Sequence, residues 1–332
     1  MRSFFLLVIL TLLIGACGVR SEEFPSGQLT ANPNNPLLRN GPEEFDYWKT
    51  GPRVVLKEGP SNYRMWYEAV GRDGVTRVGY ATSSDGLTWT KMGIVMSPEG
   101  WERDEVSPNS ILLEDGLYKM WYHGGGFQEE GKRLGTGQIG YATSRDGLSW
   151  AKDMANPVIA VGEDGSFEDG QVVDARVLKA GNVYRMYYTG QNRNTLLKSL
   201  ALATSPDGVT WTKYTDNPLL GPDRFGGWGG AFIVHGGIWN LWHARSDDSS
   251  GIVYKWSLDG ISWNDGPSNP VLVPSGDPSA ADSQAVGDSV SGYFDGATYR
   301  IMYSGFNSDF RGTGRSESIC LATINVTPRK FK

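Results

Sequence analysis

Two aspartates, Asp174 and Asp288, have the residue type and the spacing that acid–base chemistry needs. Each lies ten or eleven residues before a strongly aromatic segment, and the positions at that distance before the other three aromatic segments are Pro52, Pro108 and Gly229. Two carboxylates across a gap can cleave a glycosidic bond, because one protonates the leaving oxygen while the other acts on water or on the anomeric carbon. The alternative is that both aspartates cap or hydrogen-bond neighbouring backbone.

A second group of side chains near these positions could hold a sugar. Arg176 follows Asp174 by two residues, so strand alternation directs both to one side; the alternative is an ion pair between them. His123 ends the second aromatic segment, where a structural histidine is the alternative. Glu105 is the reserve catalytic carboxylate, with a solvated loop as the alternative. The remaining candidates for substrate binding are Arg53, Trp228 and Arg245.

Internal repeats indicate the elements that position these residues. An aromatic motif of the Tyr-Arg-Met-Trp-Tyr type recurs at 63–67, 118–122, 184–188, 239–243 and 299–303. An Asp-Gly-x-x-Trp motif follows the first four copies, and each Asp-Gly pair suits a tight hairpin that requires positive φ. Each repeat therefore predicts four antiparallel strands, which is the blade of a β-propeller.

The two ends of the chain predict how the ring closes. Repeats two to four run on to an Asn-Pro-x-x segment, whereas the fifth repeat stops at residues 321–323. The missing segment, 35–38, stands near the front of the chain. An N-terminal strand that completes the last blade leaves no sheet edge unpaired. We therefore predict an all-β fold, a single five-bladed β-propeller over residues 29–332 with four antiparallel strands per blade.

Acids that recur from repeat to repeat are predicted to be scaffold, since a catalytic group is needed once in one pocket. The aspartates of the Asp-Gly turns are Asp85, Asp146, Asp207 and Asp259. A second recurrent set precedes the inner strands and comprises Asp46, Glu102, Glu168 and Asp282. Only the unrepeated acids remain as candidates for chemistry.

The composition excludes several classes of protein. The chain has 332 residues, with 44 Gly, 12% aromatic residues and a net charge of −6. It is too aromatic for a disordered chain, and its weak acidity provides no basic field for a nucleic-acid partner. The two Cys and three His lack zinc-site spacing, so no metal and no cofactor are predicted, with a structural calcium ion in the channel left open.

The first seventeen residues have the features of an export signal. A positive start, an apolar run from Phe4 to Ile14 and small residues before Cys17 are typical of a signal peptide, since eleven apolar residues are too short for a bilayer core of about 30 Å. Residues 14–17 resemble a bacterial lipobox, which implies lipidation at Cys17; cleavage and release is the alternative. We expect a lipoprotein signal peptide over 1–17, a tether over 18–28 and an extracytoplasmic domain, periplasmic or at the cell surface, that meets the membrane only through its lipid.

The repeated motifs resemble the five-bladed propeller superfamily that includes glycoside hydrolase families 43, 32 and 130. Residues 173–176, Val-Asp-Ala-Arg, are similar to the Glu-Asp-Pro-Arg stretch of the family 130 mannoside phosphorylases, and 227–233 followed by 239–243 are similar to that family's later strands. Family 43 places three acids at the first three inner-strand starts, but this chain has Pro52 and Pro108 in the first two. That triad cannot be carried over whole, and the family 32 nucleophile motif is absent.

The resemblance and the uneven distribution of carboxylates favour an exported glycan-active enzyme. The leading hypothesis is a glycoside hydrolase of poly- or oligosaccharides that uses two carboxylates at the mouth of the channel. A glycoside phosphorylase is the enzymatic alternative. A carbohydrate-binding propeller lipoprotein without catalysis, or an adhesion module without a small ligand, are alternatives from other classes. The sequence gives no indication of the oligomeric state.

Overall fold

The chain is built almost entirely of β-strands. The computed structural model describes residues 23–25, 27–125, 137–245, 250–307 and 317–328. Within these residues the helices are two short 3-10 turns, η1 (Glu44–Asp46) and η2 (Gly100–Glu102), and none is long and apolar enough to span a membrane. The predicted all-β class is confirmed. The predicted signal peptide and its lipidation site Cys17 lie outside the described residues.

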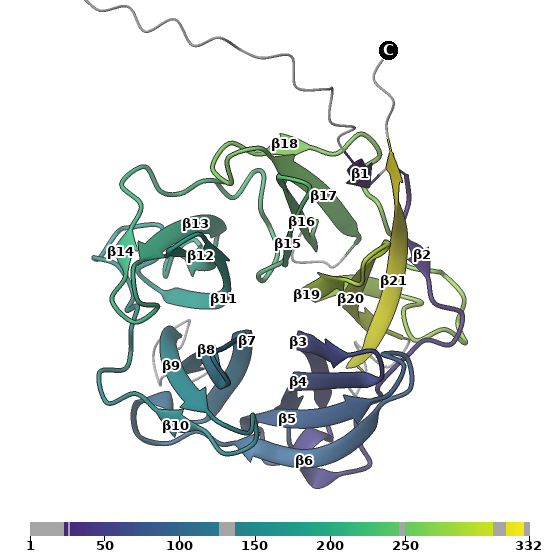
Figure 1. Ribbon diagram of the computed structural model, residues 1–332, viewed down its shortest axis with the longest axis horizontal. Coiled ribbons are helices and arrows are strands. Elements are labelled where there is room, and N and C mark those ends of the chain that lie inside the picture. The colour runs from purple at the N-terminus through teal and green to yellow at the C-terminus, as the bar shows by residue number, and fades with distance from the viewer. Residues whose placement is uncertain (1–22, 26, 126–136, 246–249, 308–316, 329–332) are drawn as a thin grey trace, which may run out of the picture.

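Groups of antiparallel strands follow one another along the chain and surround a common centre (Figure 1). The groups are β3 (Lys49–Gly59), β4 (Asn62–Val70), β5 (Thr76–Ser83) and β6 (Thr90–Met96); β7 (Glu105–Glu114), β8 (Leu117–Gly125), β9 (Gln138–Ser144) and β10 (Ala151–Lys152); β11 (Gln171–Ala180), β12 (Val183–Gln191), β13 (Lys198–Ser205) and β14 (Thr212–Lys213); β15 (Ala231–His235), β16 (Ile238–Ala244), β17 (Ile252–Ser257) and β18 (Asn264–Asp265); and β19 (Ala285–Phe294), β20 (Thr298–Phe306) and β21 (Glu317–Pro328) with β2 (Thr30–Ala31) and β1 (Glu23–Pro25). The strands β3, β7, β11, β15 and β19 lie nearest the centre.

Continuous pairing divides these strands into three sheets rather than five. One sheet has 13 strands and two have four strands each. The large sheet arises because single parallel bridges, Thr76 to Glu105 and Glu317 to Lys49, join neighbouring groups at their edges. The number of blades therefore stays a prediction.

The Asp-Gly turns are scaffold, as predicted. In the first turn Asp85 Oδ1 accepts hydrogen bonds from the main-chain N–H groups of Leu87 at 2.8 Å and Thr88 at 2.7 Å, and the other three turns repeat this pattern. These bonds lower the pKa of Asp85 to about 2. Each turn also contacts the preceding group of strands; for example, Trp66 Nε1 donates to Gly147 O at 2.8 Å.

The recurrent acids before the inner strands are scaffold as well. Glu102 Oε1 accepts a hydrogen bond from Tyr122 Oη at 2.6 Å, and Asp282 Oδ2 accepts one from Tyr303 Oη at 2.6 Å. Glu168 accepts from Lys213 Nζ at 2.7 Å. These carboxylates are buried, so each needs the partner that its own group of strands supplies.

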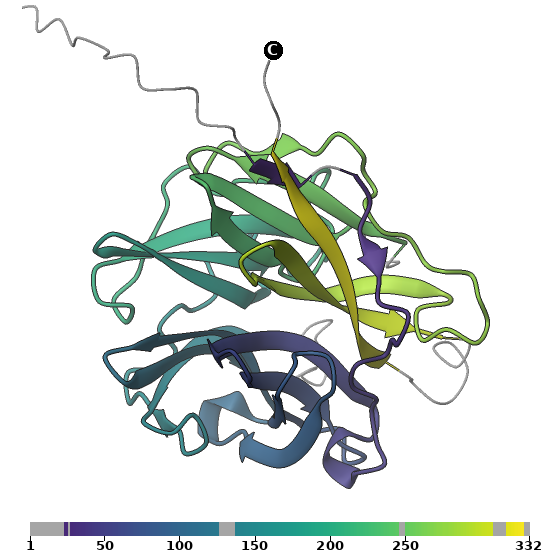
Figure 2. The same ribbon diagram turned by 45° about the vertical axis from the view of Figure 1, so that its right-hand side comes forward.

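The N-terminal segment completes the last group of strands (Figure 2). β2 pairs with β21, and Leu38 forms a bridge with Ile319. Asn35 Oδ1 accepts from Leu321 N at 2.9 Å, the same contact that Asn156 makes to Tyr141 N inside its own group. β1, which lies in the segment predicted to be a tether, also pairs with β21.

Candidate functional site

A cavity of about 240 Å³ lies where the inner strands begin. It brings together most of the side chains that the sequence singled out, from four different groups of strands and, for Trp228, from the segment before β15. These are Arg53, Glu105, His123, Asp174, Trp228 and Asp288. Lys49 and Glu68 also line it, and the sequence reasoning missed both.

The two aspartates occupy equivalent bulges of their strands. The pairing of β11 with β12 shifts between Val173 and Arg176, and that of β19 with β20 shifts between Gly287 and Val290. Asp174 and Asp288 each have φ +53° inside these bulges. Non-glycine residues rarely adopt this conformation, and aspartate tolerates it better than most. The bulges therefore direct both side chains into the cavity at a cost in backbone strain, which is typical of functional sites.

Gly229 has the corresponding conformation, with φ +61°. A Cβ at Gly229 would lie only 2.9 Å from Asp174 Cβ. The missing side chain at 229 therefore makes room for Asp174 itself.

Arg53 fixes the position of Asp174. It donates through Nη1 to Asp174 Oδ1 and through Nε and Nη2 to Glu68 Oε2, with all three residues buried. Burial raises the pKa of Asp174, but the charges of Arg53 and His123 outweigh it and hold the pKa below its usual value. Asp174 is therefore an ionised carboxylate at neutral pH.

Lys49 holds the second aspartate. Its Nζ lies 3.1 Å from Asp288 Oδ2, 2.9 Å from Glu68 Oε1 and 3.2 Å from Glu317 Oε2. Lys49 thus contacts both Asp288 and Glu68, and Arg53 contacts both Glu68 and Asp174. One chain of ion pairs therefore joins the two aspartates. Asp288 keeps 29% of its side chain exposed, so it is far more accessible than Asp174 at 2%.

Glu68 could have been found from the repeats. Glu68 pairs with Gly51 on β3, and His123 pairs with Ser107 on β7. These two pairs occupy equivalent positions in the first and second groups of strands. Glu68 is the one carboxylate at this position of the repeats, where the others have His123, Thr189, Ala244 and Ser304. Comparison of the repeats gives no reason to select Lys49.

His123 lies between the two other carboxylates. Its Nε2 is 3.2 Å from Glu105 Oε1, and its Nδ1 is 3.8 Å from Asp174 Oδ1. The main-chain N–H of Asp174 points at Nδ1 at 3.5 Å. Nε2 can therefore donate to Glu105 while Nδ1 faces Asp174.

Trp228 forms an aromatic side of the cavity. Lys198 Nζ lies 3.7 Å from the centroid of the Trp228 ring. The backbone of Trp228 forms a parallel bridge with Ser289, the neighbour of Asp288. An indole ring beside carboxylates suits a sugar, whose C–H face packs on aromatic surface while its hydroxyls reach polar groups.

Two predicted residues lie elsewhere. Arg176 does not line this cavity; its guanidinium donates to main-chain carbonyls, among them Gly230 O at 3.0 Å and Val290 O at 3.3 Å. No ion pair with Asp174 forms. Arg245 is exposed at the end of β16 and also lies outside the cavity lining. Arg176 lies within β11, where the bulge between Val173 and Arg176 breaks the strand alternation predicted for Asp174 and Arg176. Arg245 follows the last residue of β16.

No group of three or more His, Cys, Asp or Glu side chains among the described residues is arranged to hold a metal ion. At the cavity the acids instead surround Lys49 and Arg53. The site is therefore a set of carboxylates held by fixed cations, with an aromatic wall and one histidine.

Comparison with known proteins shows that the chain is similar to carbohydrate-active proteins. The model of glycoside hydrolase family 130, described as β-1,4-mannooligosaccharide phosphorylase, matches residues 111–220, which include His123 and Asp174. An uncharacterized protein of Mycobacterium tuberculosis is 28% identical over 202 residues, 56% of this chain and 62% of the relative. The 1,2-β-oligomannan phosphorylase of a Thermoanaerobacter species is 28% identical over 159 residues, 45% of this chain and 51% of the relative. The chain thus spans less than two thirds of the length of these relatives.

The fold is shared more widely than the sequence. A structure from the GH130 family of mannoside phosphorylases, which contains glycoside hydrolases that target β-1,2 mannosidic linkages in Candida mannan, aligns with a TM-score of 0.63 and 17% identity. The alignment covers 92% of this chain and 95% of that one. These matches confirm the predicted resemblance to propeller-type glycoside hydrolases and phosphorylases.

Proposed function

We infer from this resemblance that the chain is an enzyme acting on glycans, and we propose that it hydrolyses β-linked mannooligosaccharides. The observation that carries the proposal is the convergence of Asp174, Asp288 and Glu105 on one cavity beside Trp228. The matched family and the oligomannan phosphorylase support mannose as the sugar.

The environments of the carboxylates assign their roles. Asp174 is buried, ionised and hydrogen-bonded by Arg53, so it suits the base that activates water or stabilises positive charge on the sugar. Asp288 is the more exposed carboxylate and is the proposed proton donor to the leaving oxygen. Glu105, with His123 at 3.2 Å, is the reserve donor. Trp228 is the proposed sugar platform.

Water is the proposed nucleophile rather than phosphate. Phosphorolysis needs cations that are available to a phosphate group. In this cavity the charge of Arg53 is already offset by Glu68 and Asp174, and the charge of Lys49 by Glu68, Asp288 and Glu317. A phosphate there would lie against several carboxylates, and the resulting repulsion favours hydrolysis.

The proposal extends to the whole chain. We propose a single five-bladed propeller over residues 29–332, exported by the signal over 1–17 and anchored through Cys17 to a bacterial membrane. The groups of strands around one centre and the N-terminal closure support the blade count.

The test separates hydrolysis, phosphorolysis and simple binding. The purified chain is incubated with β-1,2- and β-1,4-mannooligosaccharides in ¹⁸O-labelled water, with and without inorganic phosphate, and the products are identified by mass spectrometry. We expect free mannose or shortened oligosaccharide carrying ¹⁸O, formed at the same rate with and without phosphate. Mannose 1-phosphate formed only with phosphate would overturn the choice of water.

Binding without cleavage would support the alternative of a non-catalytic sugar-binding protein. One observation favours that alternative: Asp174 and Asp288 are both held in ion pairs. Calorimetry with the same oligosaccharides detects binding independently of turnover.

A further inference from the structure

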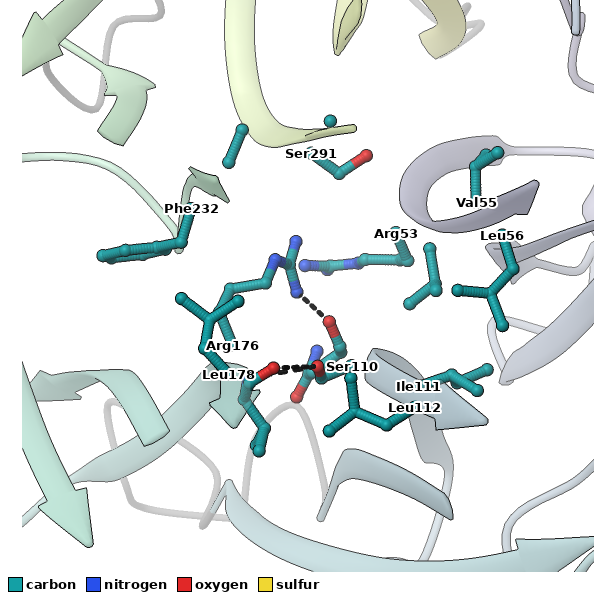
Figure 3. Close-up of a pocket in the computed structure, with 15 residues that line it drawn as sticks. Arg53, Val55, Leu56, Ser110, Ile111, Leu112, Arg176, Leu178, Phe232 and Ser291 are labelled. Atoms are coloured by element: carbon teal, nitrogen blue, oxygen red, sulfur yellow. Dashed lines mark hydrogen bonds between the residues drawn. The ribbon is translucent and has the colours of Figure 1, made fainter. Parts of the chain in front are cut away.

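A second cavity of about 150 Å³ lies further along the inner strands (Figure 3). Its polar side chains are Arg53, Asn109, Ser110, Arg176 and Ser291, and none of its lining residues is a carboxylate. The rest of the lining is largely aliphatic, with the ring of Phe232. Only Arg53 is shared with the candidate active site.

This cavity is rich in donors that lack acceptors. The five N–H groups of Arg176 meet four main-chain carbonyls, those of Gly230, Asn109, Ala175 and Val290, which leaves one N–H on Nη2. Arg53 directs one N–H of Nη1 to Asp174 and one of Nη2 to Glu68, so each nitrogen keeps a second hydrogen. Figure 3 shows the two guanidinium groups facing one another.

Ser291 supplies an independent sign of a ligand. It is 3% exposed, it lines the cavity, and its Oγ has no hydrogen-bond partner. A buried hydroxyl without a partner costs about 1 to 3 kcal/mol, so such groups in folded proteins usually bind a water molecule or an ion.

The charge balance favours an anion. Arg176 is buried, and all of its hydrogen-bond acceptors are uncharged. Burial, and then the charge of Arg53, lower the pKa of Arg176 to about 10. The charge of Asp174 opposes this lowering, but Asp174 is hydrogen-bonded to Arg53 and not to Arg176. A buried cation is stabilised when a counter-ion completes its environment.

We propose that this second cavity binds a small monovalent anion, a halide such as chloride, held by Arg176, Arg53 and Ser291. The lining is largely aliphatic, and the free donors of Arg176, Arg53 and Ser291 suit a single compact charge. The site is distinct from the cavity proposed for glycan cleavage and does not depend on that function.

Bromide is the probe, because it replaces chloride and gives an anomalous X-ray signal. The protein is crystallised in sodium bromide and in sodium gluconate, and its thermal midpoint is measured in both salts at equal ionic strength. We expect one bromide peak in contact with Arg176 and Ser291, and a higher midpoint in bromide. An empty cavity, or a cavity that holds only water in the bromide crystal, would overturn the proposal.

Substitutions identify the site in solution. Ser291→Val removes the hydroxyl and no charge, and we expect it to weaken bromide binding about tenfold, the equivalent of one hydrogen bond. Ser283→Val is the matched control, since Ser283 also has a buried Oγ without a partner but lies outside the lining. Equal bromide stabilisation of the wild type and Ser291→Val would contradict the assignment. If Ser291→Val fails to fold, Ser291→Ala replaces it.

Discussion

Asp174 and Asp288 share one backbone conformation, φ +53°, at equivalent bulges of β11 and β19. The same structural position holds Gly229 in β15's group, also with positive φ, whereas proline at 52 and 108 is restricted to negative φ. The fold thus offers this conformation at three positions, and only two of them carry a carboxylate. That relationship explains why two aspartates point into one cavity.

Removing either charge tests the catalytic roles. We expect Asp174→Asn and Asp288→Asn each to reduce turnover about 10²- to 10⁴-fold, because an amide can neither accept nor deliver the proton. The measurement is kcat on the mannooligosaccharide that the wild type cleaves, with the thermal midpoint as a check on folding.

Asp164→Asn is the matched control for these two substitutions, since Asp164 is exposed and lies outside the cavity lining. It should retain wild-type turnover. Full activity in both Asp174→Asn and Asp288→Asn would show that neither aspartate is catalytic, and a loss confined to Glu105→Gln would transfer the acid role to Glu105.

Gly229→Ala tests whether the position of Asp174 matters. A new Cβ would lie 2.9 Å from Asp174 Cβ, at a residue with φ +61°. Gly236→Ala is its control, because Gly236 has φ +59° with nothing within 4 Å. Both should lose about 1 to 2 kcal/mol of folding free energy from backbone strain. Only Gly229→Ala should also lose turnover, and equal turnover in the two variants would contradict the positioning role.

Glu317 should make stability depend on pH. Burial raises its pKa from 4.5 to about 7, against the opposing effect of Lys49. The folded state therefore keeps a proton that the unfolded chain loses, so this contribution to stability is complete below pH 4.5 and is lost as the pH rises through about 7.

Glu317→Gln has no such proton to lose. We expect its free energy of unfolding, relative to the wild type, to rise by on the order of 1 to 3 kcal/mol between pH 4.5 and pH 8 in urea titrations. The exposed Glu163→Gln is the control for the change of charge alone. A difference from the wild type that is constant with pH would refute the effect.

Asn35→Ala tests the N-terminal closure. It removes hydrogen bonds with Leu321 N at 2.9 Å, Leu321 O at 3.0 Å and Tyr303 Oη at 3.2 Å. We expect a loss of about 1 to 3 kcal/mol in urea unfolding, because main-chain groups of β21 lose their partners. Asn34→Ala, at the exposed neighbouring residue, should change stability by less than about 0.5 kcal/mol. Equal effects would argue against closure through Asn35.

The fold was largely predictable because its signals are local and repeated. The Asp-Gly turns depend on contacts two and three residues apart, such as Asp85 with Leu87 and Thr88, and such contacts can be read along the chain. The pairing of the N-terminal segment with β21 was predictable because the last repeat lacks the segment that the others have. Repetition also separated the scaffold acids from Asp174 and Asp288.

The network around those aspartates depends on contacts that no local pattern contains. Arg53 reaches Asp174 across 121 positions of the sequence, and Lys49 reaches Asp288 across 239. The sequence by itself determined which repeats carry an aspartate ten or eleven residues before the aromatic segment. Only the tertiary structure decided that Lys49 and Arg53 hold those carboxylates while Arg176 turns to main-chain carbonyls, because ion pairs depend on where the inner strands meet in space.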